Sequence, residues 1–367
     1  MSDDERTADP GIAAIGAYTP RLRVDASEFE AAWGRFDAAG VAEKAVPEAD
    51  EDALTMGAAA AQRALEAADR DGEAIPHLAV ATTTPPMAEE DLTPRLASVL
   101  GAPEDAATRT LTGSTRAGAQ ALAGALDAGP WGGSAGQSDR IGLVVVADCP
   151  RGAPDSEIEH AAGAGAAAVV LTPDGPGTVV DRAAHVESAP GSRFRGAGEA
   201  ETTGLDITQY DREAFTAALG GAADSLDVDL SGVDAAAVQS PDGKLPYRAG
   251  GALGVDTETI AAGETVRTAD AALEAAQAAG RLEHEPGIAI PTEGVPSGLA
   301  ASTLLHGPFS GDEDAAAALV AELETAEGAG HAAGDGSHAA GADAGSGGEF
   351  DRRLASLVTI DTVAGAG

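Results

Sequence analysis

Two adjacent hydroxyl side chains mark the part of this chain that could carry acyl chemistry. Ser114 and Thr115 stand where a strand-like run ending at Leu111 gives way to a helix of small residues, predicted over residues 115–126. Backbone N–H groups at the start of that helix could supply an oxyanion site. A hydroxyl accepts an acyl group only when a base takes its proton, because it is a far weaker acid than a thiol. Nothing in the sequence identifies that base.

The other candidates for chemistry are one cysteine and two histidines. Cys149 is the single cysteine, so an intramolecular disulfide and a multi-cysteine zinc site are excluded. It follows the predicted strand at residues 141–147, in a different loop from the hydroxyl pair, and we interpret it as a small loop residue. His331 and His338 lie in a Gly- and Ala-rich segment, residues 327–348, for which a solvated linker is a simpler interpretation than a metal site.

The charge of the chain excludes one large class of partners. Sixty acidic residues against 22 basic ones give a formal net charge of -38. Nucleic acid is not an expected partner, because phosphate binding depends on clustered Lys and Arg. The acids are spread along the chain and the lysines are only two, Lys44 and Lys244. We interpret this as the hydrated acidic surface of a protein from a salt-rich cytoplasm, and expect its thermal midpoint to rise between low and multimolar KCl.

Length and hydropathy favour a folded cytoplasmic protein. The 367 residues are 44% apolar, enough for two modest domains or one large duplicated α/β unit. The first residues, MSDDE, are acidic and lack the apolar core of a signal peptide. No apolar run approaches the ~18 residues of a membrane span. We therefore expect no membrane association.

Short apolar runs alternate with longer helical patterns along the chain. This alternation predicts a mixed or parallel sheet covered by helices. The predicted strands cover residues 12–15, 78–82, 141–147, 166–171, 235–238 and 287–290, with one further strand within the tail at 354–363. The predicted helices cover residues 52–68, 93–100, 115–126, 211–226, 245–253, 270–279 and 312–323. Surface loops are expected around 129–139 and 190–204, which are rich in Gly, Ser and Pro.

Several stretches together resemble the archaeal hydroxymethylglutaryl-CoA synthase family, a branch of the thiolase superfamily. The resemblance extends, with gaps, from about residue 11 to 305. It rests on GIAAIGAYTPRLR at 11–23, AAWG at 31–34, PEADEDALTM at 47–56, ADCPRGAPD at 147–155, AAGAGAAA at 161–168 and PDGKLPYR at 241–248.

The resemblance implies an α/β fold of the thiolase type, with five layers, αβαβα, made of two similar halves. The N-terminal half would span residues 11–172 and the C-terminal half residues 173–307. Residues 308–350 would add a helix and a flexible linker, and residues 351–367 a short tail. In the family, coenzyme A enters a tunnel between the halves, which makes CoA or an acyl-CoA a candidate ligand here.

The resemblance also implies that the catalytic side chains have been replaced. The family's cysteine nucleophile falls on Thr115, its glutamate acid/base on Thr83 and its histidine on Gln239. Threonine cannot exchange protons at accessible pH, and glutamine can stabilise an oxyanion but cannot relay a proton. An asparagine expected within residues 267–271 is absent as well. Glu89, Glu90 and Asp91 follow Thr83 closely, but their run indicates an exposed acidic turn.

Four basic residues match positions where the family contacts CoA. Lys244 and Arg248 are four residues apart at the start of a predicted helix, which places them on one face. Arg193 and Arg195, in SRFRG at 192–196, match a loop near the CoA entrance. A plain surface role is the alternative for each of them.

These observations support three functional hypotheses. The first is a synthase-like pseudoenzyme, an acyl-CoA-binding or assembly subunit that requires no cofactor and forms a homodimer or a heteromer with an active synthase or thiolase. The second is an active acyl-CoA acyltransferase or thioesterase with altered chemistry at Thr115 or Ser114. The third is a structural protein that keeps only the fold. An open tunnel that ends at Thr115, Thr83 and Gln239 would favour the first two.

Overall fold

The structure of the chain is a computed structural model. It describes residues 11–113, 116–129, 140–173, 175, 177–188, 193–204, 208–233, 235–238, 245–257, 260–261, 302–306 and 356–365.

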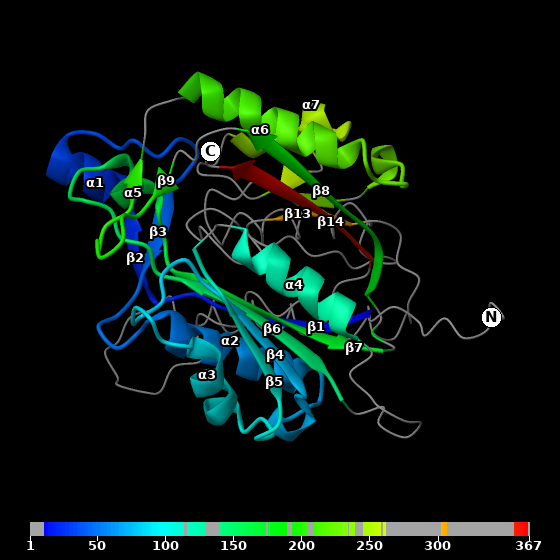
Figure 1. Ribbon diagram of the computed structural model, residues 1–367. Coiled ribbons are helices and arrows are strands. Elements are labelled where there is room, and N and C mark those ends of the chain that lie inside the picture. Colours follow the sequence, from blue (N-terminus) through cyan, green and yellow to red (C-terminus); the bar gives the residue numbers. More distant parts are fainter. Residues whose placement is uncertain are drawn as a thin grey trace, which may run out of the picture.

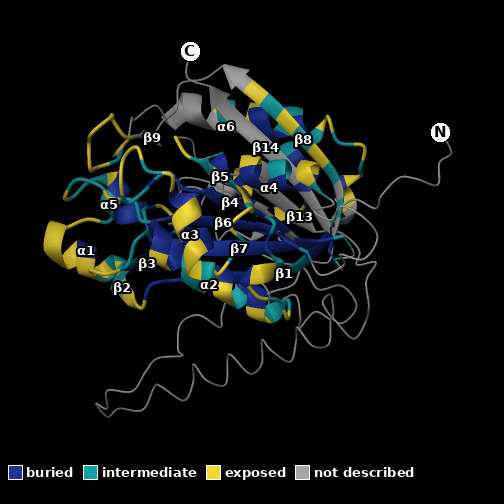
Figure 2. Ribbon diagram, turned by 60° about the horizontal axis from the view of Figure 1, so that its bottom comes forward, coloured by how far each residue is buried: buried dark blue, intermediate teal, exposed yellow. Residues whose placement is uncertain are grey.

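The first sheet has five strands in the order β1-β7-β6-β4-β5. These strands are β1 (Gly11–Tyr18), β4 (His77–Ala81), β5 (Ala107–Leu111), β6 (Gly142–Asp148) and β7 (Gly165–Thr172). The β6–β4 and β4–β5 pairs are parallel, whereas β7 is antiparallel to both β1 and β6. β4, β6 and β7 are buried along their whole length and consist almost entirely of Ala, Val and Leu, as expected for strands covered on both faces (Figure 2).

Helices cover both faces of this sheet. α2 (Ala53–Ala67) and α3 (Leu92–Leu100) pack on one face, and α4 (Ala117–Ala128) packs on the other. Alanine-rich surfaces allow α2 to approach β1 closely. A Cβ on Gly16 would lie only 2.4 Å from the carbonyl oxygen of Ala60, so a side chain at that position would push helix and strand apart.

The second sheet has the strand order β12-β11-β13-β14-β8. These strands are β8 (Thr178–Ser188), β11 (Ala235–Val238), β12 (Ile260–Ala261), β13 (Ser302–His306) and β14 (Ser356–Gly365). β14 is parallel to β8 and antiparallel to β13, so the tail of the chain is a central strand of this sheet. α6 (Thr208–Ala223) and α7 (Leu245–Leu253) contribute to the core on its outer face.

The described elements form five layers. In Figure 1, α2 and α3 lie outside the first sheet, α4 lies between the two sheets, and α6 and α7 lie outside the second sheet. Arg182 of β8 connects two of these layers, because it pairs with Asp127 of α4 at 2.7 Å and donates to the carbonyl of Ala123 at 3.2 Å. The described layers agree with the αβαβα arrangement expected from the sequence.

Smaller elements surround one end of the first sheet. A hairpin of β2 (Leu22–Asp25) and β3 (Glu43–Val46) encloses α1 (Ala26–Trp33), and α5 (Glu157–Ala161) lies beside it (Figure 1). β9 (Arg193–Phe194) pairs with β10 (Thr203–Gly204). The expectation of a loop around 190–204 is therefore wrong at these four residues, because backbone pairing turns the segment into a short hairpin.

Most predicted elements are confirmed with shifts of a few residues at their ends. β8 was not predicted, and β5 was predicted only as a strand-like run that ends at Leu111. β5 has the mixed sequence ATRTL, and β8 alternates partly buried with exposed residues. The tail strand is confirmed as β14. The predicted strand 287–290, the helices 270–279 and 312–323, and the linker 327–348 lie outside the described residues, and the domain boundaries stay predictions.

Candidate functional site

A cluster of threonines around one carboxylate lies at the ends of β4 and β6. The two strands are parallel neighbours, with Ala81 opposite Val146. Both strands therefore end at the same edge of the sheet, where β4 continues into Thr82–Thr84 and β6 ends at Asp148. The turn at residues 82–84 and the end of β6, far apart in sequence, thus form one site.

A single oxygen of Asp148 accepts five hydrogen bonds from this turn. Oδ1 accepts from the hydroxyl of Thr82 at 3.0 Å, from the backbone N–H and hydroxyl of Thr83 at 2.7 and 2.9 Å, and from the same two groups of Thr84 at 3.0 Å each. Oδ2 is buried and has no hydrogen-bond partner among the described residues. One carboxylate oxygen therefore organises three consecutive residues.

Burial changes the proton affinity of this carboxyl group. The Asp148 side chain is fully buried, which raises its pKa to about 6, while the hydrogen bonds from Thr83, Thr84 and Thr82 oppose that rise. Asp148 is thus mainly ionised at neutral pH and becomes neutral under mildly acidic conditions. Such a group could hold or release a proton near physiological pH.

Cys149 belongs to the same cluster. Its N–H donates to the Thr84 hydroxyl oxygen at 2.9 Å, and its Sγ lies 3.9 Å from that oxygen. Burial raises the pKa of the thiol, assisted by the charges of Asp148 and Asp52 and opposed by hydrogen bonds from Thr84 and Ala53. The thiol therefore stays protonated at neutral pH, which makes it a poor nucleophile.

The sequence analysis placed Cys149 in the loop that follows the strand at residues 141–147, and along the chain this position is correct. Parallel pairing of β4 with β6 nevertheless brings it against the Thr82–Thr84 turn. Asp148 was not predicted as a site residue. The signal that could have found both is that each follows a continuous apolar strand, since parallel neighbours end at one edge.

The β9–β10 hairpin reaches this site from the other half of the chain. Arg195 donates from Nη2 to the carbonyl oxygen of Thr83 at 2.9 Å. The N–H of Thr202 donates to the carbonyl of Arg151 at 2.7 Å, next to a bridge between Gly152 and Thr202. The hairpin is therefore attached to the segments that follow both β4 and β6.

The described residues include three of the predicted site positions with their side chains. Thr83 is half-buried inside the threonine cluster, Arg195 is exposed and contacts it, and Arg248 is exposed on α7. Thr83 and Arg195 are thus brought together. Ser114, Thr115, Gln239, Lys244 and the side chain of Arg193 lie outside the described residues, as do His331 and His338.

The residues that follow Thr83 behave as the predicted acidic turn. Glu89 is exposed, Glu90 pairs with Arg95 at 3.0 Å, and Asp91 caps the N-terminus of α3 through the N–H of Thr93. The carboxylates of Glu90 and Asp91 have local structural partners, which gives no support to a catalytic replacement.

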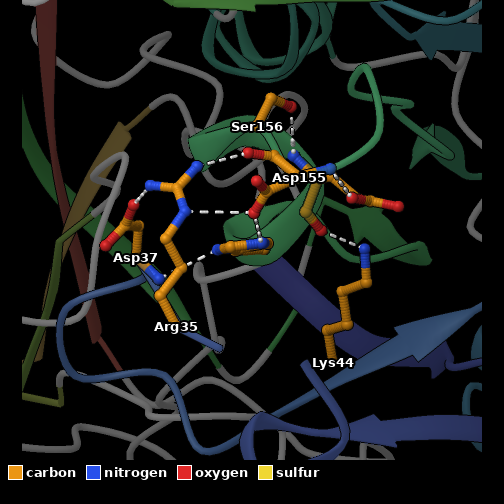
Figure 3. Close-up of polar contacts among 7 residues, drawn as sticks. Arg35, Asp37, Lys44, Asp155 and Ser156 are labelled. Atoms are coloured by element: carbon orange, nitrogen blue, oxygen red, sulfur yellow. Dashed lines mark hydrogen bonds and ion pairs between the residues drawn. The ribbon is translucent and has the colours of Figure 1, made fainter. Parts of the chain in front are cut away.

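A second polar cluster lies where the segment after α1 meets α5 (Figure 3). Arg35 bridges two acids: it pairs with Asp37, and its Nε lies 3.1 Å from Asp155 Oδ1. The Nδ1 atom of His160 accepts from the N–H of Asp37 at 2.9 Å, so the ring proton of neutral His160 must lie on Nε2. Lys44 donates to the carbonyl oxygen of Glu159.

This second cluster has the contacts of a structural unit. His160 is fully buried, and its ring stacks on Phe36 with centroids 5.5 Å apart and packs against Phe29 at 4.9 Å. Its Nε2 is 3.6 Å from Asp155, too far for a hydrogen bond. Burial lowers the pKa of Lys44, opposed by the charge of Glu159. No nucleophile adjoins the histidine among the contacts of the described part of the chain.

Neither cluster is a metal site by composition. Within the described ranges, no three His, Cys, Asp or Glu side chains are arranged to hold a metal ion. Over the same ranges, no helix is both long enough and apolar enough to cross a membrane.

Comparison with solved structures defines the class of the fold. A 3-oxoacyl-(acyl carrier protein) synthase III, FabH from Pseudomonas aeruginosa, matches with a TM-score of 0.60 at 18% identity, over 74% of this chain and 90% of that chain. An MvaS structure in complex with 3-hydroxy-3-methylglutaryl coenzyme A matches with a TM-score of 0.58 at 22% identity. The match covers 67% of this chain and 63% of that chain. The chain has a thiolase-type fold.

Sequence relatives place the chain within that class. The hydroxymethylglutaryl-CoA synthase of Methanobrevibacter smithii is 30% identical over 267 residues, which are 69% of this chain and 74% of the relative. That of Thermococcus onnurineus is 36% identical over 163 residues, and the match spans only 45% of its length. No family model matches the chain. The chain belongs to the hydroxymethylglutaryl-CoA synthase family.

Proposed function

We propose that this chain is an acyl-CoA-binding or assembly subunit that has kept the synthase fold and lost the condensation reaction. The observation that carries the proposal is the state of Thr83, which matches the family's proton-transferring glutamate. Its hydroxyl donates to Asp148 at 2.9 Å, and its carbonyl accepts from Arg195. A threonine held in this way supports the shape of a site but cannot exchange protons with a ligand.

The sequence differences at the other two catalytic positions point the same way. By the resemblance, Thr115 stands at the position of the family's cysteine and Gln239 at the position of its histidine. Groups that act together in catalysis lose most of the rate when one of them is removed. Arg195, Arg193, Arg248 and Lys244 are the residues that we propose to contact the CoA portion of the ligand.

Titration calorimetry with acetyl-CoA and intact-mass spectrometry test this proposal together. Both are run in multimolar KCl, and the mass experiment also uses acetoacetyl-CoA. We expect saturable binding without a covalent adduct. Lys244→Glu should weaken binding at least tenfold, and the same change of charge in Arg21→Glu, at an exposed residue that pairs with Glu48, should not. Equal affinity of Lys244→Glu and the unchanged protein would overturn the assigned CoA contact.

The buried carboxyl group favours one alternative. Asp148, with a pKa of about 6, is a described base beside Thr83, and a base is what the hydroxyl chemistry of an acyltransferase or thioesterase requires. An acetyl adduct that maps to Ser114 or Thr115 would establish that alternative and overturn the proposal. Hydrolysis of acetyl-CoA without an adduct would indicate a thioesterase.

The assembly part of the proposal rests on the edge of the first sheet. β5 is an edge strand with partly exposed residues, and such strands offer backbone N–H and C=O groups to another chain. We propose a homodimer, or a heteromer with a thiolase-superfamily protein, through this side. Light scattering in multimolar KCl should give twice the chain mass. A monomer, both alone and mixed with a synthase or thiolase, would contradict this.

A further inference from the structure

The polar groups of Thr83 are held from two directions. Its N–H and its hydroxyl both donate to Asp148 Oδ1, at 2.7 and 2.9 Å, and its carbonyl accepts from Arg195 at 2.9 Å. The first two contacts come from the end of β6, and the third comes from the β9–β10 hairpin. The backbone and side chain of Thr83 therefore have fixed positions relative to both halves of the chain.

We propose that Asp148 is a positioning residue that fixes the Thr82–Thr84 turn as a wall of the acyl-CoA site, acting through Thr83 without contacting the ligand itself. This inference deepens the proposed function and rests on it.

The arrangement of the carboxylate supports a positioning role. Five donors converge on Oδ1, while Oδ2 is buried without a partner in the part of the chain that the structure describes. Leaving a charged oxygen in that state costs stability, and the raised pKa expresses this cost. In return, the buried charge accepts charge-assisted hydrogen bonds from the three threonine hydroxyls and from the N–H groups of Thr83 and Thr84. Such bonds are roughly twice as strong as neutral ones. The turn is thus held more firmly than local packing requires.

Three ionisable groups of the described residues lie near Asp148 or the turn that it holds. Cys149 follows it in the chain, Asp52 at the start of α2 acts on Cys149, and Arg195 binds the far side of Thr83. When Asp148 takes a proton on Oδ2, Oδ1 becomes a weaker, neutral acceptor and the turn loosens. Ligand affinity should therefore depend on the protonation of this residue.

Two substitutions separate positioning from simple stability. Asp148→Asn keeps an acceptor oxygen for the five donors and cannot titrate, whereas Asp148→Ala removes the acceptor. Asp71→Asn is the matched control: Asp71 accepts from the N–H of Glu73 in the turn before β4, at the opposite end of that strand. For each protein, the dissociation constant for acetyl-CoA is measured at pH 5.0 and 7.5, and amide hydrogen exchange is followed at Thr83 and Thr84.

We expect Asp148→Ala to weaken acetyl-CoA binding at least tenfold at pH 7.5, and Asp148→Asn to stay within about threefold of the unchanged protein. Between pH 7.5 and 5.0, affinity should fall at least threefold more in the unchanged protein than in Asp148→Asn. The Asn variant supplies the reference because phosphate groups of CoA titrate in the same range. Exchange at Thr83 and Thr84 should accelerate at least tenfold in Asp148→Ala. Asp71→Asn should leave every value unchanged.

If Asp148→Ala does not fold, Thr83→Val takes its place. It removes one of the five donors, so we expect about threefold weaker binding and faster exchange at Thr84. The inference is overturned if Asp148→Ala or Thr83→Val binds as tightly as the unchanged protein, or if Asp148→Asn is as impaired as Asp148→Ala.

If the unchanged protein does not bind acetyl-CoA, the proposed function fails, and the exchange rates alone decide whether Asp148 positions the turn. Rates at Thr83 and Thr84 that do not differ between Asp148→Ala and the unchanged protein would then overturn the inference.

Discussion

The two polar clusters of the first half stabilise charge by different means. At the end of β6, Asp148 is fully buried, and its described hydrogen-bond partners are neutral hydroxyl and N–H groups. Beside α5, Asp155 and Asp37 share the guanidinium of Arg35, whose side chain is 48% exposed. In the core, several aligned dipoles replace a counter-ion, whereas at the surface opposite charges meet in partial contact with water.

This difference in burial predicts which substitutions lower the free energy of unfolding most. A buried acceptor with five donors has no solvent to replace it, so its loss leaves most of these donors without a partner, although the N–H of Thr84 keeps its bond to the Thr82 hydroxyl oxygen. When a surface ion pair is removed, water replaces the lost contacts, so the cost in free energy of unfolding is small. Within the second cluster, buried His160 should behave like the core, while Arg35 should behave like the surface.

Removing the acceptor of the threonine cluster should have the largest effect. Asp148→Ala leaves the hydroxyls and N–H groups of the turn without their common partner, and we expect a loss of about 4 kcal/mol in the free energy of unfolding. Urea denaturation in multimolar KCl measures it. Asp148→Asn should lose less than half as much. A loss below about 1 kcal/mol for Asp148→Ala would show that water or other acceptors replace the carboxylate.

The same carboxyl group should make stability depend on pH. An unfolded aspartate releases its proton near 3.8, and folded Asp148 near about 6. Between these values the folded state binds more protons, so the free energy of unfolding should fall as pH rises, by up to roughly 3 kcal/mol. The difference between the unchanged protein and Asp148→Asn, measured from pH 4 to 7, isolates this contribution. Parallel curves for the two proteins would contradict the raised pKa.

His160→Ala should have a smaller effect, about 2 kcal/mol, from the lost ring packing and the unpaired N–H of Asp37. The contacts that disappear are those with Phe29 and Phe36 and the bond to Nδ1. His160→Gln, which can still accept at a similar position, should recover part of the loss. Denaturation curves that agree for Ala and Gln would show that packing alone matters at this site.

Arg35→Gln should have the smallest effect, under about 1 kcal/mol, because its ion pairs with Asp37 and Asp155 are half-exposed. The difference should decrease further between low and high KCl as salt screens the charges. A loss as large as that of His160→Ala, or one that does not change with salt, would place Arg35 with the core instead of the surface.

The sequence predicted the strands and helices whose pattern is continuous. β4, β6 and β7 are apolar runs, and α2, α3 and α6 have helical periodicity, so their own residues define them. β8 was not predicted and the start of β5 was not defined, because a partly exposed strand and an edge strand carry mixed residues. The β9–β10 hairpin was not predicted either. Strands of two residues carry no recognisable sequence pattern and are defined only by their pairing.

The candidate site, like the fold, was only partly predicted from the sequence. Thr83 and Arg195 were singled out from the sequence, through resemblance to a family to which the chain belongs. Their contact, and the roles of Asp148 and Cys149 beside them, were not foreseen. Residues 83, 148 and 195 come from three separate segments, and no local pattern encodes which strand ends are neighbours.

The sequence by itself determined the acidic character of the chain, its family, and its main helices and strands. Tertiary structure decided that β4 and β6 lie side by side and in parallel, that the tail enters the second sheet as β14, and that one carboxylate oxygen holds three threonines. The physical reason is that composition and periodicity are local properties. A buried charge acquires its pKa and its partners only from the elements packed around it.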